Sequence, residues 1–215
     1  FQASVQNTAP GMARVTLMAR VASPLPCDHL GVGTLMAELN TGFDCSVCGA
    51  KHDVLPLSFS VKAPFASATI PTAERGRRVV LTPEQCILDG CRFYLRGRIP
   101  LRIHELDEPF IWGVWAEISP RDFMHIHEHW HTPGREAAKP YTGWLNTSLP
   151  LYGRTLNLAV EVHTQPVGRR PHFHVTDALH PLAREQRDGI SLARVQEIAA
   201  AVLHADHATS WTASR

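Results

Sequence analysis

The sequence contains no long apolar run and almost no net charge, and these two absences narrow the classes of protein to which it can belong. No apolar run reaches the roughly 20 residues that a membrane-spanning helix needs, so we expect no membrane segment. The formal net charge of the 215 residues is +1, which does not suggest the strong positive field of proteins that bind nucleic acid. We therefore expect a soluble protein and do not expect a nucleic-acid partner. We expect the short basic runs at residues 75–78 and 169–170 to be solvated.

Several motifs that would identify an enzyme class are also missing. The sequence has no serine nucleophile elbow, no phosphate-binding P-loop and no glycine fingerprint for a dinucleotide. Its first residues lack the charged and apolar regions of a secretory signal, so we expect a cytoplasmic location with reduced thiols. The five cysteines, an odd number, then favour metal binding over disulfides.

Residues 1–35 differ in composition from the rest of the chain. They contain one acidic residue, Asp28, and show no sustained helical or strand period. The sequence begins with Phe1, and Met36 offers a native start. We expect residues 1–35 to be a disordered or non-native leader, and residues 36–210 to form a single globular domain with a sizeable core.

Strand patterns dominate the organised part of the chain. Short apolar or alternating runs predict strands at residues 55–61, 86–88, 92–103, 110–118, 155–162 and 171–175. Helices are fewer: one short turn that opens at Thr82, one helix from Ser119 to about Pro133, and one that is capped by Ser191. The turn residues between strands suit antiparallel neighbours. We predict an α+β fold with a mainly antiparallel sheet, a few flanking helices and an N-terminal CxxC knuckle.

The first metal-binding pattern is the pair Cys45 and Cys48, which is followed by Gly49. Cysteines at this spacing can turn both sulfurs toward one ion, and the glycine allows the left-handed backbone that such a turn needs. Zinc takes four ligands, so two more are required. The candidates for them are His52, Cys86 and Cys91. Two buried, inert thiols are the alternative, and a thioredoxin-like redox pair is disfavoured because no helix obviously follows the second cysteine.

A second pattern lies at residues 127–131, which match the HExxH motif of zinc hydrolases. On a helix, His127 and His131 share a face, and Glu128 could act as general base toward a zinc-bound water. Histidine occupies every second position from His125 to His131, which makes a chance match easy, and the predicted helix ends close to His131. The competing interpretation is a solvated, histidine-rich helix face.

A third group of polar residues lies toward the C-terminus, where Asp177 and His180 could form an acid–base pair. The alternative is the capped entry of a helix with surface charges around it. The catalytic candidates of the whole chain are Glu128, Asp177 and His180.

An ordered set of residues along the chain resembles a known family. It begins with Phe43, Cys45, Cys48 and His52, and continues through Cys86, Phe93, Arg96, the aromatic run 110–115, Arg170-Pro171 and residues 185–190. Over about residues 43–200 this set resembles the bacterial family called domain of unknown function 2199, which carries no established activity. The resemblance places Cys45, Cys48, His52 and Cys86 in the family's own pattern and so nominates Cys86 as a ligand. It also implies that His127 and His131 are a local feature.

These patterns predict an uncharacterised, zinc-stabilised binding or regulatory domain without established catalysis. The zinc would be structural and held by Cys45, Cys48, His52 and Cys86, and the partner would be an unknown small molecule or protein. The alternative is a zinc-dependent hydrolase that uses either the helix at residues 127–131, with His127 and His131 as ligands, or an open position at the CxxC site. A nucleic-acid-binding zinc module is a third hypothesis, against which the near-neutral charge argues.

Overall fold

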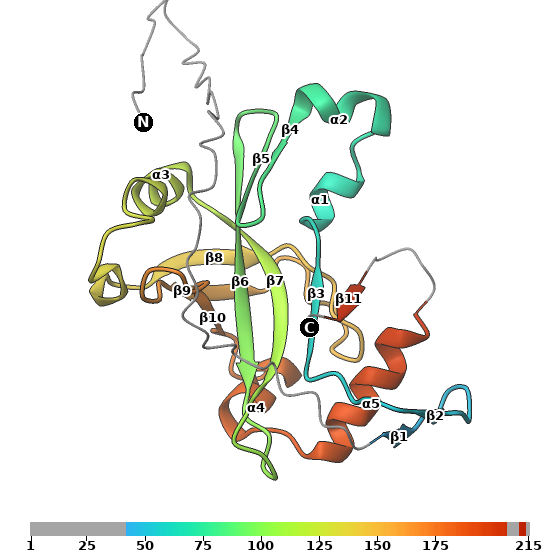
Figure 1. Cartoon of the computed structure of the whole chain (residues 1–215). Helices are drawn as coiled ribbons and strands as arrows, with labels where there is room; N and C mark the ends of the chain where they lie inside the picture. Colours follow the sequence, from blue (N-terminus) through green and yellow to red (C-terminus); the bar gives the residue numbers. More distant parts are fainter. Residues whose placement is uncertain (1–41, 206–210, 214–215) are drawn as a thin grey trace, which may run out of the picture. The chain divides into compact units, whose positions relative to one another are not determined.

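The structure is a computed structural model, and it describes residues 42–205 and 211–213 (Figure 1). The predicted leader, residues 1–35, lies outside the described residues, and the proposed division at residue 36 stays a prediction. The strands are β1 (Phe43–Asp44), β2 (Lys51–His52), β3 (Ser58–Val61), β4 (Val79–Leu81), β5 (Gln85–Leu88), β6 (Arg92–Leu101), β7 (Phe110–Ile118), β8 (Tyr141–Leu145), β9 (Ala159–His163), β10 (His172–Val175) and β11 (Trp211–Ala213). The helices are α1 (Phe65–Ala68), α2 (Thr72–Arg78), α3 (Pro120–Glu128), the 3-10 turn η1 (Arg135–Ala137), α4 (Pro181–Asp188) and α5 (Leu192–Leu203).

The main sheet contains nine strands in the order β11-β3-β7-β8-β9-β10-β6-β5-β4. Because β6 also pairs with β7 from Phe93 to Leu101, the five strands from β6 to β10 close into a small barrel. Figure 1 shows β6 and β7 running side by side as the longest strands. The strands β3 and β11 extend the sheet from β7, while β5 and β4 extend it from β6. A separate two-stranded sheet pairs β1 with β2.

The main sheet is mixed, so the prediction of a mainly antiparallel sheet is not confirmed. The pairs β10–β6 and β3–β7 are parallel, and the other ladders described in this sheet are antiparallel. Parallel neighbours need a long crossover connection. The connection from β3 to β7 contains β4, β5 and β6, and the connection from β6 to β10 contains β7, β8 and β9. Local turn residues reveal hairpins, but they do not reveal which distant strands become neighbours.

Several predicted elements are confirmed and one is wrong. The strand β7 has the predicted bounds, and Ser119 caps α3 by accepting a hydrogen bond from the backbone N–H of Asp122. The helix α3 ends at Glu128, earlier than expected. Thr82 opens no helix: its Oγ1 accepts hydrogen bonds from the N–H groups of Glu84 and Gln85 and so tightens the β4–β5 hairpin. A threonine can cap a helix or close a turn by the same kind of bond, and the pairing of β5 with β6 decides the outcome here.

Successive side chains of β6 alternate between two separate hydrophobic cores. Leu95 and Ile99 lie in the larger core cluster, together with residues of β7 to β10 and of α5. Tyr94, on the opposite face of the strand, lies in a smaller cluster with Cys86 and Trp115. Because side chains alternate along a strand, Arg96 and Arg98 share the face of Tyr94, outside the barrel core.

None of the helices in residues 42–205 has both the length and the apolar character needed to span a bilayer.

Candidate metal centre

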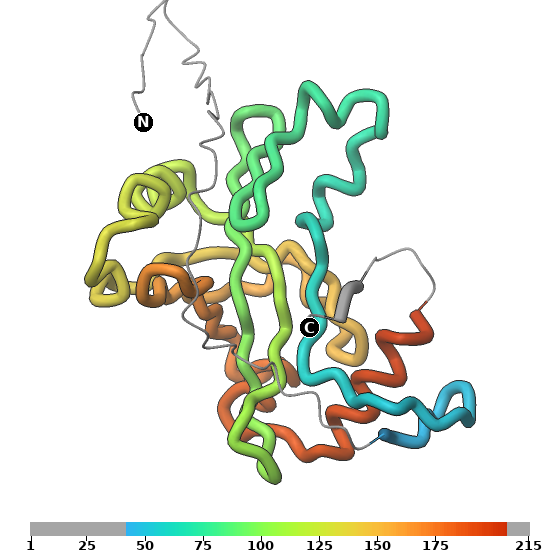
Figure 2. Tube along the Cα trace, in the orientation of Figure 1, coloured from blue at the N-terminus to red at the C-terminus, as the bar shows by residue number. Residues whose placement is uncertain are grey.

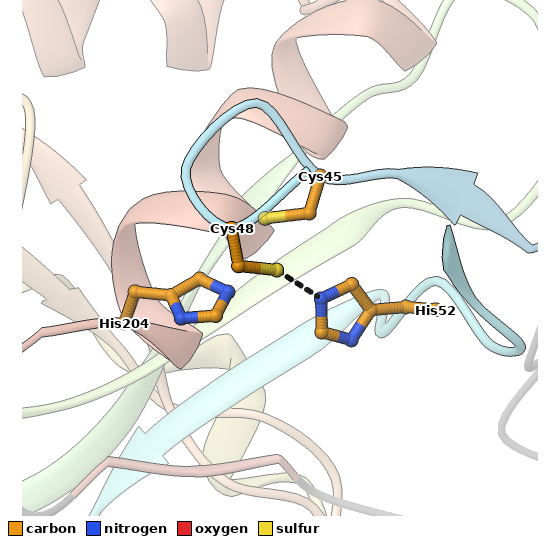
Figure 3. A group of neighbouring side chains, drawn as sticks. All are labelled: Cys45, Cys48, His52 and His204. Atoms are coloured by element: carbon orange, nitrogen blue, oxygen red, sulfur yellow. Dashed lines mark hydrogen bonds between the residues drawn. The ribbon is translucent and has the colours of Figure 1, made fainter. Parts of the chain in front are cut away.

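Four side chains converge beside the two-stranded sheet: Cys45, Cys48, His52 and His204 (Figure 3). Their sulfur and nitrogen donor atoms all lie within 4.8 Å of one another. Zinc binds thiolate sulfur at about 2.3 Å and imidazole nitrogen at about 2.0 Å, so its ligands in a tetrahedron lie about 3.3–3.8 Å apart. Cys48 and His204 are exposed, and their side chains have room to make the small rotations that would close the group around one ion.

The hairpin β1–β2 positions three of these donors by local geometry. Phe43 pairs with His52 across the two strands. The turn between the strands is held by the N–H of Gly49, which donates to the Cys45 carbonyl at 2.9 Å, and by the Cys45 N–H, which donates to the Ala50 carbonyl at 2.9 Å. Gly49 has a φ of +70°, and a Cβ there would meet nothing within 4 Å. The glycine is therefore needed for its left-handed backbone and not for space.

The CxxC turn at residues 45–48, which we call the knuckle, also favours the charged form of Cys45. Hydrogen bonding from the backbone of Cys48, and to a lesser extent of Val47, lowers the pKa of the buried Cys45 thiol to about 6, against the opposing effect of burial. The thiolate is the form that binds metals, so Cys45 is prepared as a ligand at neutral pH. Its neighbour Cys48 has its sulfur 3.6 Å from Nε2 of His52.

His204 is the donor that sequence reasoning missed. It is the C-cap residue of α5, and its ring lies 5.7 Å from the ring of His52. The buried face of α5, which includes Val195 and Ile198, belongs to the same core cluster as Phe43 and Cys45. Figures 1 and 2 show α5, near the red end of the colour scale, alongside the blue N-terminal hairpin. The capping residue Ser191 and the apolar repeat predicted this helix. Nothing in them indicated that the end of the helix would lie against the hairpin β1–β2.

Cys86, the ligand nominated by the family resemblance, is not brought to the knuckle. It lies on β5, fully buried in the smaller core cluster with Tyr94 and Trp115. Burial raises the pKa of its thiol to about 12, which is the behaviour of a packing residue. Cys91 is exposed just after β5 and also lies outside the group of four. The fourth potential donor beside Cys45, Cys48 and His52 is His204.

Thiol reactivity distinguishes the two assignments of Cys86. Burial raises its pKa well above the ordinary value and shields its sulfur, so its thiolate is scarce at pH 8. We expect Cys86 to resist iodoacetamide both with and without a chelator, as measured by mass-spectrometric peptide mapping. Exposed Cys91 should be labelled in both states, and exposed Cys48 only after chelation. Labelling of Cys86 that depends on the chelator would instead identify it as a ligand.

The HExxH pattern does not assemble into a site. The helix α3 ends at Glu128, so His131 lies beyond it and does not share a helical face with His127. Nδ1 of His127 lies 2.9 Å from Oε1 of Gln85, while Glu128 and His131 are exposed. Among the described residues, a group of three or more potential metal ligands occurs at the knuckle, and it includes neither His127 nor His131. The pattern therefore fits the solvated helix face.

Asp177 and His180 have structural partners. Oδ1 of Asp177 accepts the Leu179 N–H at 3.0 Å. Nδ1 of His180 accepts the Leu182 N–H at 3.2 Å and so caps α4. These two side chains organise a turn and a helix entry, which is the alternative that the sequence offered.

Fold and site together define a mixed α+β barrel domain with a candidate Cys2His2 metal centre. A family model described as an uncharacterized protein conserved in bacteria (DUF2199) matches residues 44–190. The match covers more than half of the chain, which therefore belongs to this family. No curated protein and no solved structure matches the chain. Cys45, Cys48 and His52 lie within the family match, whereas His204 lies beyond its end.

Proposed function

We propose that the knuckle binds one zinc ion through Cys45, Cys48, His52 and His204, and that this ion is structural. The observation that carries the proposal is the convergence of four donors from the hairpin β1–β2 and from the end of α5. Two sulfurs and two imidazoles form a donor set common in structural zinc sites, and thiolates disfavour hard cations such as Ca²⁺ and Mg²⁺. Four protein ligands leave no position for a substrate or a reactive water.

The zinc ion would tie the C-terminal helix to the N-terminal hairpin. Because such a site does not exist in an unfolded chain, the free energy of metal binding contributes to folding. The domain would then serve the cytoplasm as a binding or regulatory module without catalysis, with a small molecule or a protein as its partner. The roles of the other candidates support this: His180 caps α4 and Asp177 closes a turn.

The hydrolase alternative receives no support from this arrangement. It needs His127 and His131 one turn apart on a helix, and α3 ends before His131. It could also use an open position at the knuckle, but the proposed coordination by His204 fills that position.

Metal analysis by plasma mass spectrometry tests the proposal. We expect one zinc per chain in the wild-type protein and in the control His131→Ala, which removes an exposed histidine outside the group. The double variant Cys45→Ser/Cys48→Ser should contain no zinc, and His204→Ala should bind it at least tenfold more weakly. Zinc that persists in His204→Ala but disappears from His127→Ala/His131→Ala would reject the proposed ligand set.

A further inference from the structure

A second site candidate is a cavity of about 300 Å³ outside the barrel core. Its walls come from the β4–β5 loop, the strand β6, the segment that follows α3 and the β9–β10 loop; the elements can be located in Figure 1. The residues that decide its chemistry are four arginines, one glutamate and a tryptophan: Arg98, Arg135, Arg169, Arg170, Glu84 and Trp130. We call this cavity the arginine pocket. All of these residues lie within the stretch that matches the family model.

The arginine pocket has an excess of positive charge. Glu84 forms a two-pronged ion pair with Arg170, with N–O distances of 2.7 and 2.8 Å. Within residues 42–205 and 211–213, the guanidinium groups of Arg98 and Arg169 have no hydrogen-bond or ion-pair partner. Four arginines against one glutamate leave three positive charges uncompensated by the lining.

Arg135 gives the pocket a rigid base. Its buried guanidinium donates to the carbonyl oxygens of Gln165, Trp130 and Arg169, each at 2.7 Å, and lies 4.6 Å from the centre of the Trp130 ring. These bonds hold the β9–β10 loop in place, but every acceptor is a neutral carbonyl. A buried charge without a counter-charge is costly in free energy, and an anion in the pocket would offset that cost.

The strand β6 carries a second arginine, Arg96, near the pocket but outside its lining, where the charge of Arg170 acts on it. Arg98 is half-buried, and burial together with the charge of Arg170 lowers its pKa. Arg96, two residues earlier on the same face, donates to Ser60 Oγ and to the Pro83 carbonyl. Its buried Nε has no partner among the described residues. Among the described residues, no protein acceptor takes the guanidinium donors of half-buried Arg98 and exposed Arg169, so an anion that enters the pocket can reach both.

We propose that the arginine pocket binds a phosphate group, free or as the monoester of a small molecule, between the guanidinium groups of Arg98 and Arg169. Guanidinium groups match phosphate oxygens in pairs. A phosphate monoester carries about −1.5 to −2 charges at neutral pH, which suits the excess charge of the lining better than a single carboxylate does. The volume is at the lower end of the range of small-molecule sites.

This inference names phosphate as the ligand class of the binding domain proposed above. It rests on the proposed function only in taking the domain to be a binding module. The metal centre supplies none of the pocket residues. Zinc content measured on the same samples therefore separates a failure at the knuckle from a failure in the pocket.

Calorimetric titration with inorganic phosphate at constant ionic strength tests the inference. We expect saturable binding with one site per chain, weakened about tenfold by Arg98→Gln and by Arg169→Gln, because each removes a charge-assisted hydrogen bond. The matched control is Arg154→Gln, which neutralises an exposed arginine outside the pocket and should leave the affinity unchanged. Absence of saturable binding, or an equal affinity in all four proteins, would overturn the proposal.

The variant Glu84→Gln provides a test of opposite sign. Removing the carboxylate releases Arg170 from its ion pair, so phosphate should bind about three- to tenfold more tightly than to the wild type. Damage to the fold would weaken binding instead, so a gain in affinity supports a phosphate site, and a loss at an unchanged melting temperature contradicts it. A parallel titration with succinate separates the anion classes, because tighter binding of succinate than of phosphate would replace the phosphate assignment with a dicarboxylate.

Discussion

Removal of the metal with a chelator is expected to lower the melting temperature of the protein by about 8–16 °C. A ligand present at 1,000 times its dissociation constant stabilises the native state by about 4 kcal/mol, and each kcal/mol shifts the melting temperature of a domain of this size by about 2–4 °C. The loss should be this large because the proposed ion links Cys45, near the start of the described chain, to His204 at the end of α5. Calorimetric scans with and without chelator measure it.

Hydrogen exchange shows where the stability is lost. Amide protection should fall in β1–β2 and in the last turn of α5, while the amides of β6 and β7 should keep theirs, because local opening follows local contacts. The control Cys91→Ser removes an exposed thiol outside the group of four and should respond to the chelator as the wild type does. Identical melting with and without chelator in the wild type would mean that these four residues hold no stabilising ion.

The part of the metal centre that the sequence predicts is the part built by short-range structure. Cys45, Cys48 and His52 lie in one hairpin, so their spacing along the chain already limits their spacing in the fold. His204 comes from the far end of the chain and joins them only because α5 packs on the core that contains Phe43. The strand that carries Cys86 was predicted from its pattern, but the pattern does not say which of two cores that residue enters.

The same limit applies to the arginine pocket. A pair of arginines at residues 169–170 has the composition of a solvated loop, and the sequence led to that expectation, which fits the exposed Arg169 but not Arg170, which is partly buried in an ion pair with Glu84. The structure places these residues beside β6 because β10 pairs with it in parallel, with His172 opposite Arg98. That pairing joins strands separated by much of the chain, so no local turn signal reveals it. Each candidate site therefore combines residues that are close in the sequence with residues that only long-range contacts bring near them.

The substitution Gly97→Ala is expected to be strongly destabilising, and the reason lies in this parallel pairing. In Gly97→Ala, the new Cβ would lie 2.4 Å from both Cε1 and Cζ of Phe173, which is far inside van der Waals contact. Phe173 is fully buried in the barrel core, and β10 is held beside β6 by the Arg98 N–H, which donates to the Pro171 carbonyl at 2.9 Å. Because the ring is fully buried, it can retreat only by displacing its core neighbours. We expect a loss of about 1–3 kcal/mol in the free energy of unfolding, typical of overpacking.

Denaturant titration measures this loss, and two further variants identify its cause. In Gly76→Ala the new Cβ meets nothing within 4 Å, and alanine is the better helix former, so this matched control in α2 should be stabilised by up to about 1 kcal/mol. The double variant Gly97→Ala/Phe173→Leu should cost less than the sum of its two single changes, because the smaller side chain makes room for the methyl group. Strict additivity would show that residues 97 and 173 do not touch. The barrel would then not close along β6 and β10, and the arginine pocket, which depends on the same pairing, would lose one of its walls.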